Sequence, residues 1–244
     1  MSIAAHPTEP ISYPESDGQP MAENTEQFRW IVTVKENLEV LFRDAPQVFV
    51  AGDLLWYPVE GRPDIRRAPD TMVVFGRPKG RRGAYLQWRE DGLAPQVVFE
   101  ILSPGNSLKE LAQKFEFYDT HGVEEYYLYD PDSNDLNGWQ RQGGRLRTIA
   151  EMHAWVSPRL GIRFEHRLAD LVIYYPDGQP FLSFVEMERR ARSAEERATT
   201  AEERATTAEQ RITTAEQEAQ QAHRRAEQLA ARLRALGIDP DSTE

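Results

Sequence analysis

Apolar residues form short runs over most of this chain, and in two longer intervals they recur at helical spacing. The intervals 24–43 and 107–118 place apolar side chains three and four residues apart, which predicts amphipathic helices. Short runs of apolar, β-branched and aromatic residues predict strands. These runs cover residues 48–51, 53–57, 71–75, 84–88, 96–102 and 125–130, with several short strands expected between 136 and 174. This order of strands and helices predicts a mixed α/β domain that ends near Phe184.

The stretch 96–118 holds the clearest local signals. Pro104 and Gly105 follow its apolar strand and end it. Ser107 and Glu110 then have the S-x-x-E spacing of a capping box, which starts a helix. The helix has one apolar stripe, formed by Leu108, Leu111, Ala112, Phe115 and Tyr118. We therefore expect the helix to turn back and pack against the sheet.

Glu100 interrupts the apolar strand of this stretch. A buried carboxylate needs a metal or a cationic partner to offset the loss of water. Measured back from the turn, Glu100 lies roughly 10 Å along the strand. Lys114 lies roughly 9 Å along the helix, whereas Lys109 lies only about 3 Å past the helix start. If the helix runs back over the strand, Lys114 rather than Lys109 meets Glu100.

From Val185 the composition changes to Ala, Glu and Arg with a period of seven residues. This heptad repeat predicts a long helix over 185–237, followed by a flexible tail at 238–244. Its two seams consist mostly of small residues. They are Ala191, Ala198, Ala205, Ile212, Ala219, Ala226 and Leu233, and Ala194, Ala201, Ala208, Ala215, Ala222, Leu229 and Leu236.

The charges that flank the seams favour one arrangement of helices. In a parallel pair Arg197 faces Glu202 of the second chain, whereas an antiparallel pair brings like charges together. The repeat therefore predicts a parallel homodimer if the segment associates. A solvated single helix is the alternative, because alanine buries little apolar area.

The amino-acid composition predicts the cellular compartment of the protein. The 244 residues include no cysteine, so disulfides, thiolate metal sites and cysteine nucleophiles are excluded, and a reducing, cytoplasmic location is expected. No apolar run approaches the roughly 20 residues of a membrane span, so no membrane partner is expected. Residues 1–23 are rich in proline and acidic groups, which predicts a disordered leader.

The net charge of −11 argues against a generic nucleic-acid binder, which would be basic. Any contact with nucleic acid must come from a local patch. The densest positive patch is the loop 76–83, where Arg77, Lys79, Arg81 and Arg82 are candidate contacts to a phosphate backbone. A solvated loop explains the same residues equally well.

Asp70 at the start of one strand, Glu100 within the next long strand and Lys114 beside it form a candidate site. Two carboxylates on neighbouring strands can hold a hard cation such as Mg²⁺, with Mn²⁺ as an alternative. The cation can activate a water molecule and stabilise charge on a phosphate, while the lysine positions that water. Asp53, on another predicted strand, is a third candidate ligand or a cap of the break at Gly52. Each residue alone also has a structural explanation, such as a turn residue or a structural ion pair.

Residues 24–175 resemble the PD-(D/E)XK restriction-endonuclease-like superfamily, and in particular its Uma-type family of bacterial endonucleases. The stretches that carry the resemblance are APDTMVVFG and APQVVFEILSPGNSLKELAQKFEFYDTHGVEEYYLYDP. The resemblance implies a mixed β-sheet core flanked by helices over 24–184, with Asp70 and Glu100 as metal ligands and Lys114 in the lysine role. The superfamily usually places Glu and Lys two apart on one strand. Here residue 102 is Leu, and the lysine lies on the following helix.

Together these inferences predict a Mg²⁺-dependent endodeoxyribonuclease that cleaves DNA with metal-activated water, with RNA as an alternative substrate. The competing hypothesis is a catalytically silent nuclease-like binding module, assembled through its coiled tail. The acidic charge and the displaced lysine favour the silent module. Retention of all three polar groups favours the enzyme.

Overall fold

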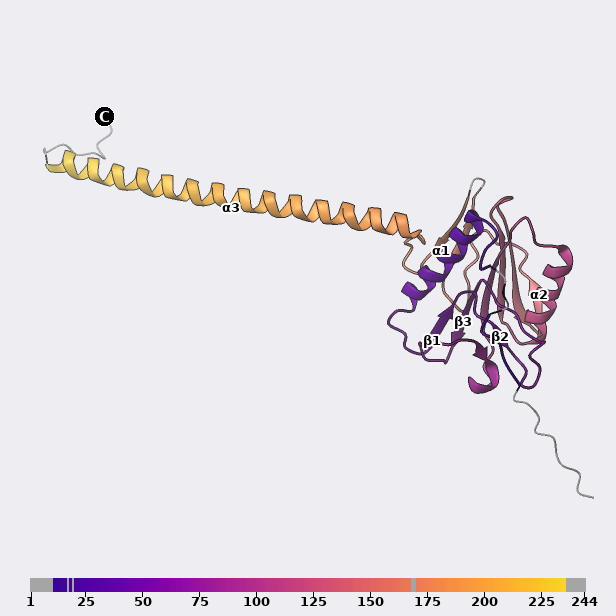
Figure 1. Cartoon of the computed structure of the whole chain (residues 1–244). Helices are drawn as coiled ribbons and strands as arrows, with labels where there is room; N and C mark the ends of the chain where they lie inside the picture. Colours follow the sequence, from indigo (N-terminus) through magenta and orange to yellow (C-terminus); the bar gives the residue numbers. More distant parts are fainter. Residues whose placement is uncertain (1–10, 17, 19, 168–169, 236–244) are drawn as a thin grey trace, which may run out of the picture. The chain divides into compact units, whose positions relative to one another are not determined.

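The computed structural model describes residues 11–16, 18, 20–167 and 170–235. Its internal contacts divide the chain after Phe184 into two units, an α/β domain and a helical segment (Figure 1). The predicted tail at 238–244 lies outside the described residues.

A mixed sheet forms the centre of the domain. Its six strands lie in the order β1-β3-β5-β6-β7-β8. The pair β5 and β6 is parallel, and the other neighbours are antiparallel. A parallel pair needs a crossover connection, which contains α2 (Leu108–Thr120). The strands are β1 (Val48–Ala51), β3 (Thr71–Phe75), β5 (Val97–Ile101), β6 (Glu125–Asp130), β7 (Asp135–Gln142) and β8 (Arg145–Thr148).

Different helices cover the two faces of the sheet, because side chains alternate along each strand. On one face, α1 (Thr25–Leu41) packs through Ile31 and Leu38 into a core that includes Val97 and Phe99. On the opposite face, α2 packs through Tyr118 into a core that includes Val98 (Figure 1). By the same alternation Glu100 faces α2.

Smaller elements complete the domain. β2 (Trp56–Tyr57) pairs in parallel with β4 (Tyr85–Leu86), which leads into the 3-10 helix η1 (Gln87–Arg89). β9 (Arg163–His166) and β10 (Leu171–Tyr174) form an antiparallel pair whose apolar residues join the core on the α1 side.

The predicted elements agree with the structure where local signals are strong. The strands expected at 48–51, 71–75 and 125–130 are confirmed residue for residue. The predicted helix start at Ser107 is also confirmed, because the Ser107 side chain accepts a hydrogen bond from the Glu110 backbone N–H at 3.2 Å.

Three predictions were wrong in detail. The strand expected at 53–57 is reduced to β2, because Asp53 adopts a left-handed turn with φ of 48°. The strand expected at 84–88 is reduced to β4 and η1. Within the expected apolar stripe of α2, Leu108 is 86% exposed and Ala112 is exposed as well. The inner face of α2 instead combines Phe115 and Tyr118 with the polar Lys114.

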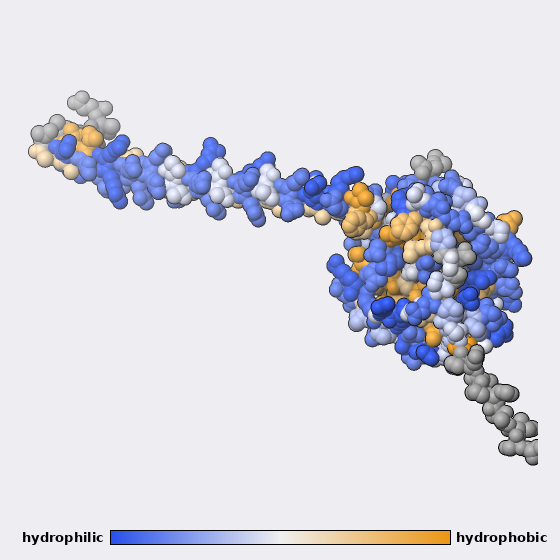
Figure 2. Space-filling view, viewed as in Figure 1, coloured by the Kyte–Doolittle hydropathy of each residue, from blue (hydrophilic) through white to orange (hydrophobic). Residues whose placement is uncertain are grey.

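The helical segment is formed by α3 (Phe184–Ala235), which has 52 residues. At the usual rise its length is roughly 78 Å. No residue of α3 is buried within the described chain, and Figure 2 shows a hydrophilic surface along most of its length. Threonine pairs repeat along it: Thr199 and Thr200 donate to the carbonyls of Glu195 and Glu196 at 3.1 and 2.9 Å. Among the described residues no helix is long and apolar enough to cross a membrane.

The described part of the expected leader contacts the domain. The Tyr57 hydroxyl donates to the Pro14 carbonyl at 2.8 Å, and the Ser103 hydroxyl donates to Glu23 at 2.6 Å. Tyr13 packs edge-on against Tyr57 at 5.3 Å between ring centroids. Residues 1–10 lie outside the described chain.

Candidate active site

Asp70 and Glu100 meet because β3 and β5 are antiparallel neighbours. The register pairs Thr71 with Phe99, so Asp70 and Glu100 are opposite one step further along. Both carboxylates face α2, on the same side of the sheet as Met72 and Val98. Their side chains are therefore neighbours on one face.

Lys114 meets Glu100, as the strand-turn-helix geometry predicts. Its Nζ donates to Glu100 Oε2 at 2.9 Å and lies 3.8 Å from Glu110 Oε1. Glu100 is 1% exposed, and its second oxygen accepts a hydrogen bond from the Tyr118 hydroxyl. One ammonium and one phenol thus compensate the burial of this carboxylate. Tyr118, which the sequence assigned only to packing, thus belongs to this polar cluster.

The buried charged groups shift one another's pKa values. Burial and the neighbouring Glu100 raise the pKa of Asp70 well above its usual value, although Lys114 and the Ile101 N–H, 2.6 Å from Asp70 Oδ2, oppose the shift. Burial alone would lower the pKa of Lys114, but the charges of Glu100 and Asp70 outweigh it and raise the pKa. Lys114 is therefore an ammonium at neutral pH.

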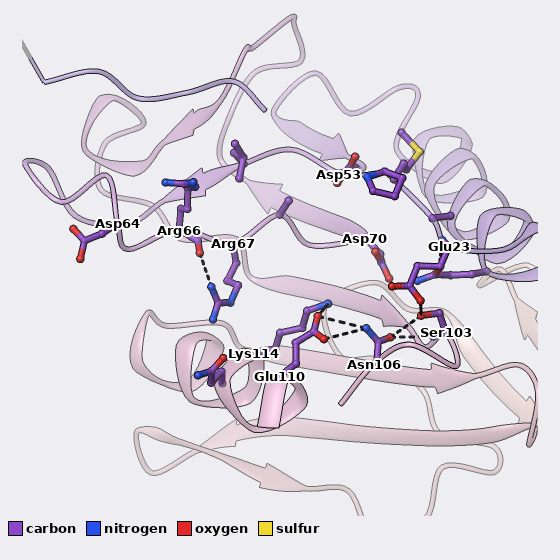
Figure 3. A pocket seen from close by; sticks show the side chains of 17 residues that line it. Glu23, Asp53, Asp64, Arg66, Arg67, Asp70, Ser103, Asn106, Glu110 and Lys114 are labelled. Carbon is purple, nitrogen blue, oxygen red and sulfur yellow. Dashed lines mark hydrogen bonds and ion pairs between the residues drawn. The ribbon is translucent and has the colours of Figure 1, made fainter. Parts of the chain in front are cut away.

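A cavity of about 610 Å³ opens over this cluster. Asp70 and Lys114 line it, whereas the nearly inaccessible Glu100 lies behind its wall. Figure 3 shows acidic groups, Asp53 and Glu23 beside Asp70, at one end of the cavity. At the other end are Asp64, Arg66 and Arg67. The arginines of the lining thus lie at the end away from Asp70, together with the acidic Asp64.

Asp53 lines the cavity from a turn, whereas the sequence predicted it on a strand. Its backbone N–H donates to the Pro69 carbonyl at 3.1 Å, which holds the turn beside Asp70. Gly52 makes this approach possible, because a Cβ there would lie 3.3 Å from the Asp70 carbonyl oxygen. Asp53 is exposed, and its charge adds to the raised pKa of Asp70.

The predicted basic loop is largely paired with acidic groups of the domain. Arg77 and Arg82 share Glu90, with Nε to carboxylate distances of 2.8 and 2.6 Å. Lys79 lies 3.4 Å from Glu39, and Arg81 is exposed. Among these four residues, none lines the cavity. Contact between this loop and nucleic acid stays a prediction.

Arginines at the cavity come from a segment that sequence reasoning did not single out. Arg66 and Arg67 precede Asp70 in the loop after β2, which shows no periodicity. Glu23, Ser103 and Asn106 also line the cavity and were not predicted. The sequence signal that could have found the arginines is their adjacency, four and three residues before Asp70.

The donor set fits a hard divalent cation. Within the described residues, no group of three or more His, Cys, Asp or Glu side chains is placed to hold a metal ion. Mg²⁺, however, is commonly held by one or two carboxylates and completes its shell with water and substrate phosphate. Asp70 and Glu100 are such a pair. Burial and then the negative charge of Glu100 raise the pKa of Asp70, and a cation would offset that charge.

The mixed sheet, the helix on each face and the acidic pair beside a lysine define a restriction-endonuclease-like α/β protein. The model of the Uma2 family, described as "Putative restriction endonuclease", matches residues 10–170. The match covers more than half of the 244 residues, so the chain belongs to the Uma2 family.

Among solved structures, one similar chain is titled "a putative nuclease belonging to DUF820" from Anabaena variabilis. It has 16% sequence identity and a TM-score of 0.42, over 61% of this chain and 83% of that chain. Among curated proteins no relative matches this chain.

Proposed function

We propose that the protein is a Mg²⁺-dependent endonuclease that hydrolyses phosphodiester bonds in DNA. The observation that carries this proposal is the buried pair of Asp70 and Glu100, with the Lys114 ammonium bonded to Glu100 at the wall of an open cavity. Such a constellation, in a member of a nuclease family, fits metal-assisted hydrolysis better than a purely structural ion pair.

Asp70 and Glu100 would hold the cation, which when bound supplies positive charge that stabilises a reacting phosphate and activates water. Lys114 acts as a positioning cation. One of its N–H groups is bonded to Glu100, and the others can orient a water or a phosphate oxygen. Glu100 and Asp70 raise the pKa of Lys114, which favours the charged form that this role requires.

The test is cleavage of DNA by the wild type and by Asp70→Asn and Glu100→Gln, with Mg²⁺, with Mn²⁺ and with EDTA. Both variants keep the shape of the side chain, and we expect each to lose about 100-fold or more of the metal-dependent rate. Asp132→Asn, in an exposed turn, is the matched control and should cleave normally. Undiminished cleavage by both site variants would overturn the assignment.

A second candidate is a binding module that does not cleave. The position of Glu100 favours it, because both its oxygens accept hydrogen bonds, from Lys114 and Tyr118, and the residue lies behind the cavity wall. Titration calorimetry with Mg²⁺ and Mn²⁺ separates the two functions. Heat of binding that Asp70→Asn abolishes supports the enzyme, whereas a wild type without metal binding supports the module.

A further inference from the structure

The active-site cavity continues into a second cavity of about 290 Å³ beside the C-terminal half of α2. Four residues line both cavities: Asp64, Arg66, Arg67 and Gln113. Because the two openings share this wall, they form one groove that leads away from Asp70. The second cavity ends at Phe117 and His121.

Arg66 and Arg67 use only part of their hydrogen-bonding capacity in this wall. Nη1 of Arg66 donates to the Pro63 carbonyl at 2.7 Å, and Nη1 of Arg67 donates to the Arg66 carbonyl at 3.1 Å. No carboxylate of the described residues lies within 4 Å of either guanidinium, whereas Asp64 is paired with Arg62 at 2.7 Å. The hydrogen bond from Arg62 and then the charge of Arg66 lower the pKa of the nearby Asp64 carboxyl, but neither Arg66 nor Arg67 forms an ion pair among the described residues. Half-buried guanidinium groups of this kind suit a bound phosphate, which they can contact bidentately.

The far end of the groove is aromatic. The rings of Phe117 and His121 lie 4.6 Å apart, and Phe117 packs edge-on against the buried Trp56 at 5.1 Å. Burial lowers the pKa of His121, so its ring is neutral at pH 7. Arg67 also lies over the Phe117 ring, at 5.8 Å. The two rings lie at 61° to each other, so a base can stack on one ring and meet the edge of the other. An aromatic face next to cations is the combination that binds an unpaired base and its phosphate.

We propose that this groove binds the nucleotide next to the scissile bond, with its phosphate on Arg66 and Arg67 and its unpaired base against Phe117 and His121. This assignment rests on the proposed nuclease function and names its substrate class. A base within a duplex is stacked and paired, so it cannot present its face to a side wall. The preferred substrate is therefore single-stranded or locally unpaired DNA.

The test measures binding without cleavage, by fluorescence anisotropy in EDTA, with labelled oligodeoxythymidylate and a duplex of equal length. We expect the wild type to bind the single strand more tightly. Arg66→Ala with Arg67→Ala should lower the slope of log K against log salt by roughly 0.7 per lost phosphate contact. Replacement of both by lysine should restore the slope, since charge is kept. Phe117→Leu should weaken single-strand binding roughly tenfold, with little effect on the duplex.

Arg147→Ala is the matched control, because Arg147 is an exposed arginine on β8 outside the groove. Thermal melting of each variant checks the fold. An unchanged salt slope in a folded double-alanine variant, or a wild type that prefers the duplex, would overturn the groove assignment while wild-type cleavage upholds the nuclease. Loss of slope in a protein that cleaves nothing with any metal would uphold the groove and overturn the nuclease.

Discussion

Two buried glutamates of the sheet are compensated in different ways. Glu100 and Glu125 are each 1% exposed. Glu100 has an ammonium partner in Lys114, whereas Glu125 accepts hydrogen bonds from neutral donors. These donors are the Tyr127 and Ser157 hydroxyls and the Arg159 backbone N–H. Burial raises the pKa of Glu125, and the hydrogen bonds oppose the shift without cancelling it.

Because the pKa of Glu125 is raised in the folded state, its contribution to the free energy of unfolding decreases as pH rises. Between the unfolded and folded pKa values of Glu125, the folded state binds more protons. Its contribution is therefore fully present below the unfolded pKa of about 4.3 and is lost as pH rises through the folded pKa. Glu125→Gln removes the titration, so we expect its unfolding free energy to fall less than that of the wild type over this range. Urea unfolding at a series of pH values measures this difference.

The control is Glu60→Gln, which changes an exposed carboxyl of the loop after β2. Its pH profile should run parallel to that of the wild type. If the Glu125→Gln profile also runs parallel, the buried carboxyl does not titrate as the structure indicates.

At single positions, the sequence predicted a contact correctly where rigid local structure fixes the distance between two residues. Glu100 and Lys114 could be paired because a strand, a tight turn and a capped helix leave few arrangements. Asp53 was assigned to the wrong backbone conformation, since a left-handed turn leaves no periodic signal. Arg66 and Arg67 enter the site through a loop, and loop positions depend on tertiary contacts that one sequence does not encode locally.

At the scale of elements, predictions depended on how many independent signals agreed. β1, β3 and β6 combine apolar runs with clear breakers, and their bounds were predicted correctly. In α2 the capping box set the start correctly, but the apolar stripe was misjudged at its first turn. Leu108 follows directly after the cap, where the helix has just left the sheet edge and its side chain remains in solvent.

The cap of α2 can be tested as an element. Ser107→Ala removes the acceptor for the Glu110 N–H and should lower the unfolding free energy by about 1 kcal/mol. Ser107→Gly should cost only a few tenths of a kcal/mol, because glycine tolerates the cap backbone and leaves that N–H open to water. Chemical unfolding of the domain measures both changes. Equal losses for alanine and glycine would show that the hydroxyl contributes by another route.

At the scale of the whole molecule, the role of α3 does not follow from the structure of the α/β domain. Its seam residues from Ala191 to Leu229 are exposed in the single chain, and its length far exceeds that of an average helix. The repeat of Arg at one flank and Glu at the other continues over three heptads. We propose that two copies pair in parallel through this segment, because that register sets opposite charges across the seam.

Charge exchange tests both association and direction. One variant changes Arg197, Arg204 and Arg211 to Glu, and a second changes Glu202, Glu209 and Glu216 to Arg. In a parallel pair each variant alone sets like charges across the seam, so its self-association should weaken roughly tenfold or more, at about 0.3–0.5 kcal/mol per pair. An equal mixture restores every opposite pair and should associate better than either variant. Sedimentation equilibrium of the full chains measures all three samples. A wild type that stays monomeric at high concentration would leave α3 a solvated single helix, and a mixture no tighter than its components would exclude the parallel register.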